Sequence, residues 1–212
     1  MRALQLLGQP ADPSTPPRGA VLVLHGGVER STEPVGLRSG SWRRATLLAR
    51  SITPALTESG IAVHGLRYTV RGWNADLGEP SPLADARWAI DSLRALHPET
   101  PVVLLGHSMG GRVALHVADD PAVIGVVGLA PWWPADDPVD HLTGRHVVGA
   151  HGEHDRITRS RHTRRLLERA ASVAASTEYV DMGPLGHYML TGVRRWNRTA
   201  RDAVLTMFGV ND

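Results

Sequence analysis

Short apolar segments alternate with longer amphipathic segments from Arg18 to the end of the chain. The short segments are as long as strands, and several are apolar throughout, which is typical of parallel strands covered on both faces. The longer segments carry apolar residues every three or four positions, as helices with one buried face do. The alternation predicts an α/β fold, with about six strands in a mostly parallel sheet and helices on both faces.

The boundaries of the expected elements follow from where each pattern starts and stops. Pro54 is expected to break or kink the first helix, because proline supplies no N–H to the helical ladder. The last helix has no clear capping residue near its expected start. The expected strands are residues 20–24, 62–68, 101–105, 123–129, 146–150 and 177–180, and the expected helices are residues 41–58, 82–97, 109–119, 158–174 and 188–208.

Length and hydropathy indicate one domain. With 212 residues, of which 42% are hydrophobic, the chain can bury one substantial core but not two. We expect a single domain over residues 18–212, preceded by a proline-rich and only partly ordered leader at residues 1–17. No segment approaches the roughly 18 to 20 continuous apolar residues of a membrane helix, and no secretion signal is recognisable. A cytoplasmic protein without a membrane span is expected.

Absent and scattered residue types argue against several kinds of chemistry. The sequence has no cysteine, which excludes disulfides, thiolate metal sites and a cysteine nucleophile. All 23 basic residues are arginine, but they are scattered among 21 acidic residues and leave a net charge of only +2. We therefore expect no nucleic-acid partner. Neither a metal nor another cofactor is expected.

The segment from Gly106 to Gly110, Gly-His-Ser-Met-Gly, joins an expected strand directly to an expected helix. It has the sequence of a nucleophile elbow, a turn so tight that the serine backbone is strained and a Cβ on either glycine would clash. The turn exposes the Ser108 hydroxyl at a helix N-terminus, where free N–H groups favour developing negative charge. The motif alone occurs by chance in a chain with 22 glycines. Its position between a buried strand and a helix makes Ser108 the predicted nucleophile.

Over residues 18–210 the chain resembles the α/β-hydrolase superfamily, particularly its small lidless esterase-like and dienelactone-hydrolase-like members. In that superfamily the acid follows a later strand and the histidine follows the last one. The resemblance implies that Asp155 is the orienting acid and that His187 is the general base, which takes the serine proton and returns it to the leaving group. Dienelactone hydrolases use a cysteine nucleophile, so that particular reaction is not implied here.

Two other roles remain open for the residues around this expected triad. Asp181 lies on the loop that bears His187 and is the competing acid. His151 and His154, together with Asp155, have a spacing that metal ligands also show. Of the remaining histidines, His25 and His107 are expected to stabilise loops through hydrogen bonds rather than to take part in catalysis.

The segment His-Gly-Gly-Val at residues 25–28 resembles the oxyanion loop of the superfamily. The resemblance implies that the backbone N–H groups of Gly27 and Met109 bind the tetrahedral oxygen, with Val28 as the alternative if the loop is shifted by one residue. The loop at residues 28–40 is expected to shape a partly polar entrance. The residues expected to line the substrate pocket are Val28, Trp73, Trp132 and Trp133, and the alternative for the tryptophans is packing in the core.

Residues 131–145 are too few for the helical cap that larger relatives insert between these two strands. An open crevice suits a small to medium acyl or aryl ester better than a long-chain lipid. We therefore expect a serine hydrolase resembling carboxylesterases, which acts through an acyl-enzyme. Two alternatives remain: a thioesterase or acyltransferase of a biosynthetic pathway, and a non-catalytic binding protein that keeps the hydrolase fold.

Overall fold

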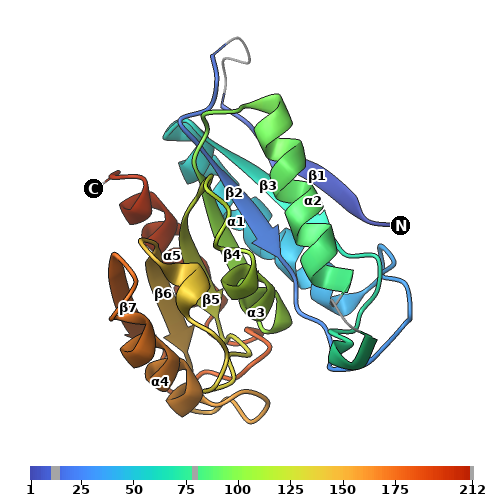
Figure 1. The fold of residues 1–212 in the computed structure, drawn as a ribbon, viewed down its shortest axis with the longest axis vertical. Coiled ribbons are helices and arrows are strands. Elements are labelled where there is room, and N and C mark those ends of the chain that lie inside the picture. The colour runs from blue at the N-terminus through green and yellow to red at the C-terminus, as the bar shows by residue number, and fades with distance from the viewer. Residues whose placement is uncertain (11–14, 78–80, 211–212) are drawn as a thin grey trace.

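A computed structural model describes residues 1–10, 15–77 and 81–210 of the chain. Within these residues, seven strands form one sheet in the order β1-β3-β2-β4-β5-β6-β7, and every pairing is parallel except that of β1 with β3 (Figure 1). The prediction of a mostly parallel sheet is confirmed. The strands are β1 (Ala3–Gly8), β2 (Gly19–Leu24), β3 (Ile61–Arg67), β4 (Val102–His107), β5 (Val123–Leu129), β6 (His146–His151) and β7 (Ser176–Asp181).

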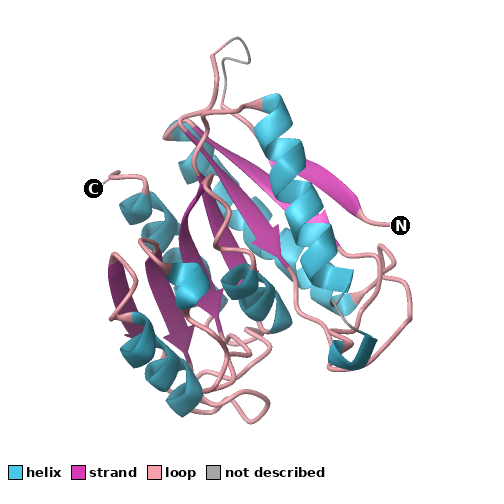
Figure 2. Cartoon of the chain, in the orientation of Figure 1, coloured by secondary structure: helices cyan, strands magenta, loops and turns pink. Residues whose placement is uncertain are grey.

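Helices cover both faces of the sheet (Figures 1 and 2). One face packs against α1 and α5, and the other against α2, α3 and α4. Strands β2 and β4 are buried along their whole length because they have a helical layer on each side, which explains why their sequences are apolar throughout. The helices are α1 (Gly40–Glu58), α2 (Ser81–Leu96), α3 (Met109–His116), α4 (Ser160–Ala170) and α5 (Val193–Met207), with short 3₁₀ helices at Ala75–Leu77 and Asp140–Leu142.

The leader, expected to be partly ordered, contributes the edge strand β1, which was not predicted and pairs antiparallel to β3, while residues 11–14 of the leader lie outside the described residues. The helix expected over residues 41–58 is confirmed as α1, which continues through Pro54 to Glu58. The last helix begins only at Val193, because Gly192 adopts a left-handed conformation (φ 61°) immediately before it.

The connection between β5 and β6 contains no regular element except the 3₁₀ helix Asp140–Leu142. No helical cap therefore covers the carboxyl ends of these strands. In parallel sheets, the loops at the carboxyl ends meet at one edge, which is where such folds place their ligands. None of the helices in the described residues is long and apolar enough to cross a membrane.

Candidate active site

Ser108 lies at the junction of β4 and α3 with a backbone conformation that non-glycine residues rarely adopt, φ 55° and ψ −119°. The turn is possible because its two glycines lack side chains. A Cβ on Gly106 would lie 2.3 Å from the Gly110 carbonyl oxygen, and a Cβ on Gly110 would lie 2.2 Å from that of Leu24. The strained geometry predicted for the elbow is therefore present, and it directs the Ser108 side chain into a cavity.

Three polar side chains from three separate loops form one hydrogen-bonded chain. The Ser108 hydroxyl lies 3.0 Å from His187 Nε2, and His187 Nδ1 donates to Asp155 Oδ2 at 2.7 Å. Ser108 follows β4, Asp155 follows β6 and His187 follows β7, so the parallel sheet brings together residues that are far apart in the sequence. The structure thus places the three residues of the expected triad in the order that proton transfer requires.

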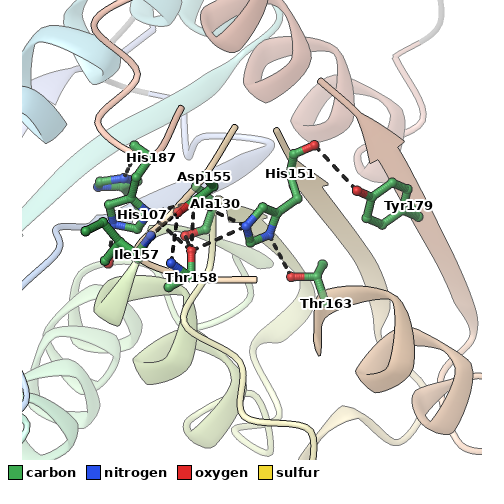
Figure 3. A network of polar contacts seen from close by, with 10 residues as sticks. His107, Ala130, His151, Asp155, Ile157, Thr158, Thr163, Tyr179 and His187 are labelled. Atoms are coloured by element: carbon green, nitrogen blue, oxygen red, sulfur yellow. Dashed lines mark hydrogen bonds and ion pairs between the residues drawn. The ribbon is translucent and has the colours of Figure 1, made fainter. Parts of the chain in front are cut away.

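Asp155 is surrounded by hydrogen-bond donors (Figure 3). Its Oδ1 atom accepts the backbone N–H groups of Ile157 and Thr158, both at 2.8 Å. Its Oδ2 atom accepts the Thr158 hydroxyl at 2.8 Å and His151 Nε2 at 3.2 Å, in addition to His187. Burial alone would raise the pKa of Asp155, but the hydrogen bonds from His151, His187 and the Thr158 backbone hold it well below its usual range. The carboxylate stays ionised and fixed beside the base.

Sequence reasoning did not identify His151 and Thr158 as partners of the acid. His151 is fully buried, and its other ring nitrogen accepts the Thr163 hydroxyl at 2.8 Å. Figure 3 shows His151 and His187 on opposite sides of Asp155. His154, the other residue of the possible metal motif, is exposed instead of facing this carboxylate. The only signal in the sequence was the closeness of these residues to Asp155, which does not reveal the direction of their side chains.

The competing acid, Asp181, lies away from the base. Its Oδ1 atom accepts the backbone N–H of Gly183 at 2.7 Å, and its Oδ2 atom lies 3.4 Å from Arg164 in an exposed ion pair. Asp181 ends β7 and stabilises the turn that follows. The geometry therefore favours Asp155 as the partner of His187.

The expected oxyanion donors lie next to the nucleophile. Within the described residues, the N–H groups of Gly27 and Met109 donate to no protein acceptor, so both are free to bind an oxyanion. Val28, the alternative donor, is engaged, because its N–H donates to the Arg71 carbonyl oxygen at 3.0 Å. A Cβ on Gly27 would lie 2.3 Å from that same oxygen, so a glycine is needed where the two segments meet. Gly27 and Met109 remain the proposed pair.

Two buried histidines hold the loops of the site. His25 Nδ1 donates to the Gly26 carbonyl oxygen at 2.6 Å, and its Nε2 accepts the Tyr68 backbone N–H at 3.2 Å. His107 Nε2 donates to the His187 carbonyl oxygen at 3.0 Å. Burial is the main cause that lowers the pKa of each imidazole to about 4. Both rings are therefore neutral near pH 7, and the donor and acceptor roles of the two His25 nitrogens also require a neutral ring.

We expect the free energy of unfolding to fall when the pH is lowered from 7.5 to 5.0. Three buried histidines, His25, His64 and His107, have pKa values lowered to about 4, chiefly by burial. Between pH 6.5 and 4 these three histidines are protonated in the unfolded chain but neutral in the folded chain. Their contribution to the free energy of unfolding is complete above pH 6.5 and is lost toward pH 4. At pH 5 the loss is about 1 to 2 kcal/mol for each histidine. Urea unfolding at the two pH values measures the difference.

Replacement of one buried histidine tests the assignment. His64→Leu should make stability less dependent on pH, whereas His154→Gln, at an exposed position, should leave the dependence unchanged. Asp155 does not contribute in this window, because its lowered pKa affects stability only below the ordinary carboxyl pKa. Equal stability of the wild-type protein at pH 7.5 and 5.0 would show that these imidazoles protonate freely in the folded state.

A cavity of about 760 Å³ opens beside Ser108 and His187. One wall is the loop after β2 and the start of α1, and the opposite wall is formed by the elbow and the loop that carries His187. Val28 lines the cavity as expected, and Glu33 and Arg38 supply the polar entrance expected from residues 28–40. The lining residues that sequence reasoning missed include Ser41, Arg44, Arg71, Tyr188 and Leu190.

The three tryptophans expected to line the pocket do not line this cavity, so that part of the prediction is wrong. Trp133 is buried, donates from Nε1 to the Gly111 carbonyl oxygen at 2.8 Å, and packs where Gly128 and Gly149 have no side chains. Trp73 and Trp132 pack against the Arg112 guanidinium, with ring centroids 4.4 and 4.6 Å from its central carbon. Trp133 is therefore part of the core, and Trp73 and Trp132 pack around the ion pair of Arg112 with Asp137.

A parallel sheet with a strained serine elbow, a histidine and a buried acid defines a class of α/β proteins built for attack by a serine on a carbonyl group. The sequence matches the model of the alpha/beta hydrolase family over residues 21–209. The chain belongs to this family, as its resemblance to the superfamily predicted. The search of curated proteins found no match to the sequence.

Solved structures with this fold include several esterases. A serine hydrolase without a lid from Xanthomonas campestris is 20% identical, with a TM-score of 0.64, and the match covers 97% of this chain and 87% of that one. Est1E from Butyrivibrio proteoclasticus, solved with ferulic acid, is 14% identical, with a TM-score of 0.72 and coverages of 98% and 96%. Esterase 2 from Thermogutta terrifontis, phosphonylated by cyclosarin, is 16% identical, with a TM-score of 0.72 and coverages of 99% and 90%. At these identities the likeness shows a shared fold alone.

Proposed function

We propose that the protein is a serine esterase that hydrolyses small to medium carboxylic esters through an acyl-enzyme. The observation that carries the proposal is the hydrogen-bonded chain from Ser108 through His187 to Asp155, at the edge of an open cavity. Structural packing alone does not account for a serine held at φ 55° with its hydroxyl against an imidazole. Strain of this kind persists where the surrounding structure enforces it, commonly at active sites.

The geometry supports a two-step reaction. Ser108 Oγ attacks the ester carbonyl carbon while His187 Nε2 takes the hydroxyl proton, and Asp155 stabilises the resulting imidazolium. The N–H groups of Gly27 and Met109 bind the tetrahedral oxyanion. Collapse breaks the bond to the alcohol, which leaves with the proton from His187 and produces an acyl-serine. Water then attacks the acyl-serine with the same base, which releases the carboxylic acid and restores the Ser108 hydroxyl.

The shape of the cavity supports the substrate size. No helical cap covers it in the part of the chain that the structure describes, so a long acyl chain would remain in contact with water along part of its length. The volume of about 760 Å³ is within the usual range for small-molecule pockets. Several neighbours in fold are described as esterases, which supports ester hydrolysis over other reactions of the family.

Two measurements on the wild-type protein test the proposal. A fluorophosphonate probe should modify Ser108, located by mass spectrometry, and should leave Ser41 of the same cavity unmodified, because the Ser41 hydroxyl lies beside Ser39 and His25 and not in the hydrogen-bonded chain of His187. A series of p-nitrophenyl esters from two to twelve carbons should show the highest kcat/KM at short to medium lengths. A folded protein that neither reacts with the probe nor hydrolyses any ester would contradict the proposal and favour a non-catalytic binding protein.

The same assay distinguishes the alternative reactions. If kcat/KM is far higher for acyl thioesters than for the matched oxygen esters, the protein is a thioesterase. If added alcohol or amine acceptors yield more acyl-transfer product than free acid, the protein is an acyltransferase. We expect oxygen esters and water to be preferred, because the open cavity gives water direct access to an acyl-serine.

A further inference from the structure

The wall of the active-site cavity carries an excess of positive charge. Four charged residues line the cavity: Glu33, Arg38, Arg44 and Arg71. Arg71 and Glu33 form an ion pair at 2.5 Å and neutralise one another. Arg38 and Arg44 have no acidic partner within the residues the structure describes. Two cationic side chains therefore face the space beside the nucleophile without a counter-ion.

Arg44 is the less exposed of these two arginines. It lies in the second turn of α1 and is half-buried, and the first turn of that helix contains no acidic residue. In the described part of the chain its guanidinium makes no side-chain hydrogen bond, and burial lowers its pKa below the ordinary arginine value. Arg44 lines the same cavity as Ser108 and His187. After burial and the electrostatic effect of His187, the charge of Arg44 also lowers the pKa of His107, which precedes Ser108 in the elbow.

Other half-buried arginines have protein partners that Arg44 lacks. Arg112 donates two hydrogen bonds to Asp137, at 2.6 and 2.7 Å, between the rings of Trp73 and Trp132. Arg67 and Arg145 donate to backbone carbonyl oxygens. Arg44 is partly desolvated without such a partner in the described residues, and its donors remain available to an anion in the cavity.

Apolar side chains also line the cavity. Tyr188 and Leu190, on the loop that carries His187, are 61% and 73% exposed, and Val28, on the loop after β2, is 39% exposed. Exposed apolar side chains at a cavity mouth bind the hydrocarbon part of a ligand. The lining thus combines apolar side chains that suit a hydrocarbon group with cationic side chains that suit an anion.

We propose that the preferred substrates are esters that carry a carboxylate, and that Arg44 is the specificity-determining residue that binds this carboxylate. The inference rests on the proposed esterase function of the same cavity. Arginine is suited to the role because its planar guanidinium can bind both oxygens of a carboxylate at once. Arg38, more exposed at the entrance, adds charge that attracts the same anion.

A matched pair of esters tests the proposal. The mono-4-nitrophenyl ester of adipic acid and 4-nitrophenyl hexanoate have the same leaving group and six acyl carbons, and they differ only in the terminal carboxylate. The six-carbon chain also limits attack of the carboxylate on its own ester. We expect the wild-type protein to have the higher kcat/KM on the adipate ester, mainly through a lower KM, and we expect this preference to shrink in 0.5 M NaCl.

Variants then assign the preference to one residue. In Arg44→Gln the ratio of kcat/KM on adipate to that on hexanoate should fall about tenfold or more, the usual scale for loss of a hydrogen bond to a charged group. Arg43→Gln, at the exposed preceding position of α1 and outside the cavity, should leave the ratio unchanged. Similar kcat/KM for both esters in the wild-type protein, or a ratio that Arg44→Gln does not lower, would overturn the proposal.

A binding measurement separates failure of this inference from failure of the esterase proposal. Hydrolysis of the hexanoate ester without any effect of Arg44 leaves the esterase intact and removes the anion site. If neither ester is hydrolysed, isothermal titration of the Ser108→Ala variant with monomethyl adipate and methyl hexanoate decides the question. Tighter binding of the adipate, lost in the Ser108→Ala, Arg44→Gln double variant, would support the anion site even in a protein that is not an esterase, and equal binding would reject it.

Discussion

Replacement of Ser108 with alanine is expected to lower kcat for ester hydrolysis by roughly 10⁴- to 10⁶-fold, the range found when a serine nucleophile is removed from such a triad. The variant retains His187, Asp155 and the oxyanion donors, but it has no oxygen at the position 3.0 Å from His187 Nε2. Hydrolysis then depends on direct attack by water on a bound ester. The initial rate with 4-nitrophenyl butyrate, measured with variant and wild type at the same concentration, gives the ratio.

Controls show that the loss is chemical. Alanine also has a Cβ, so Ser108→Ala keeps the backbone constraint of the elbow, and its circular dichroism and urea midpoint should match those of the wild type. Ser92→Ala removes a serine on α2 whose hydroxyl donates to the Trp88 carbonyl oxygen, and it should keep full activity. A Ser108→Ala protein within tenfold of wild-type activity would mean that another group is the nucleophile.

Elements with strong local patterns were predictable from the sequence. The strand β5 has the bounds expected from its run of apolar residues, and the elbow was recognisable because its five residues form one continuous motif between a strand and a helix. The edge strand β1 was not predicted, because it is half-exposed, follows no alternating pattern and is stabilised by pairing with β3, more than fifty residues away. Pro54 in α1 shows the same effect for helices, because packing of Ile52 and Leu56 against the sheet outweighs one missing hydrogen bond.

Within the site, a residue's role was predictable when it depended on neighbours in the sequence and not when it depended on contacts made by folding. Ser108 stands in a local motif, whereas the contacts of His151 and Thr158 with Asp155 depend on how one loop folds back on itself. Trp133 was misplaced because the space it occupies is created by Gly128 and Gly149 on two neighbouring strands. Arg44 could not be singled out among 23 arginines, since its distinguishing property is the lack of a partner in the folded chain.

Replacement of Asp155 with asparagine is expected to lower kcat by about 10⁴-fold, as loss of the orienting carboxylate does in a serine triad. Asp155 Oδ2 accepts His187 Nδ1 and thereby holds the base with its Nε2 free to accept the serine proton. An asparagine carries no charge to stabilise the imidazolium. If its amide nitrogen takes the Oδ2 position, it also donates to Nδ1 and fixes the opposite tautomer.

The environment of Asp155 indicates that both orientations of the amide are unfavourable. Both carboxylate oxygens accept from several donors, namely two backbone N–H groups at Oδ1 and the Thr158 hydroxyl, His151 and His187 at Oδ2. An amide nitrogen is itself a donor, so at either position it would face the donors that now bind the carboxylate and could accept a hydrogen bond from none of them. We therefore expect Asp155→Asn to lower the free energy of unfolding as well, by about 1 to 3 kcal/mol, which urea unfolding at pH 7.5 measures.

Asp181→Asn is the matched control, because it changes the competing acid in the same way. Its carboxylate is exposed and contacts Gly183 and Arg164 but not His187, so kcat should stay within about twofold of wild type, the usual result for an exposed ion pair. The reverse pattern, with Asp181→Asn inactive and Asp155→Asn active, would assign the acid to Asp181. Loss of activity in both variants with normal folding would mean that the two carboxylates act together on His187, which the separation of their hydrogen-bond networks argues against.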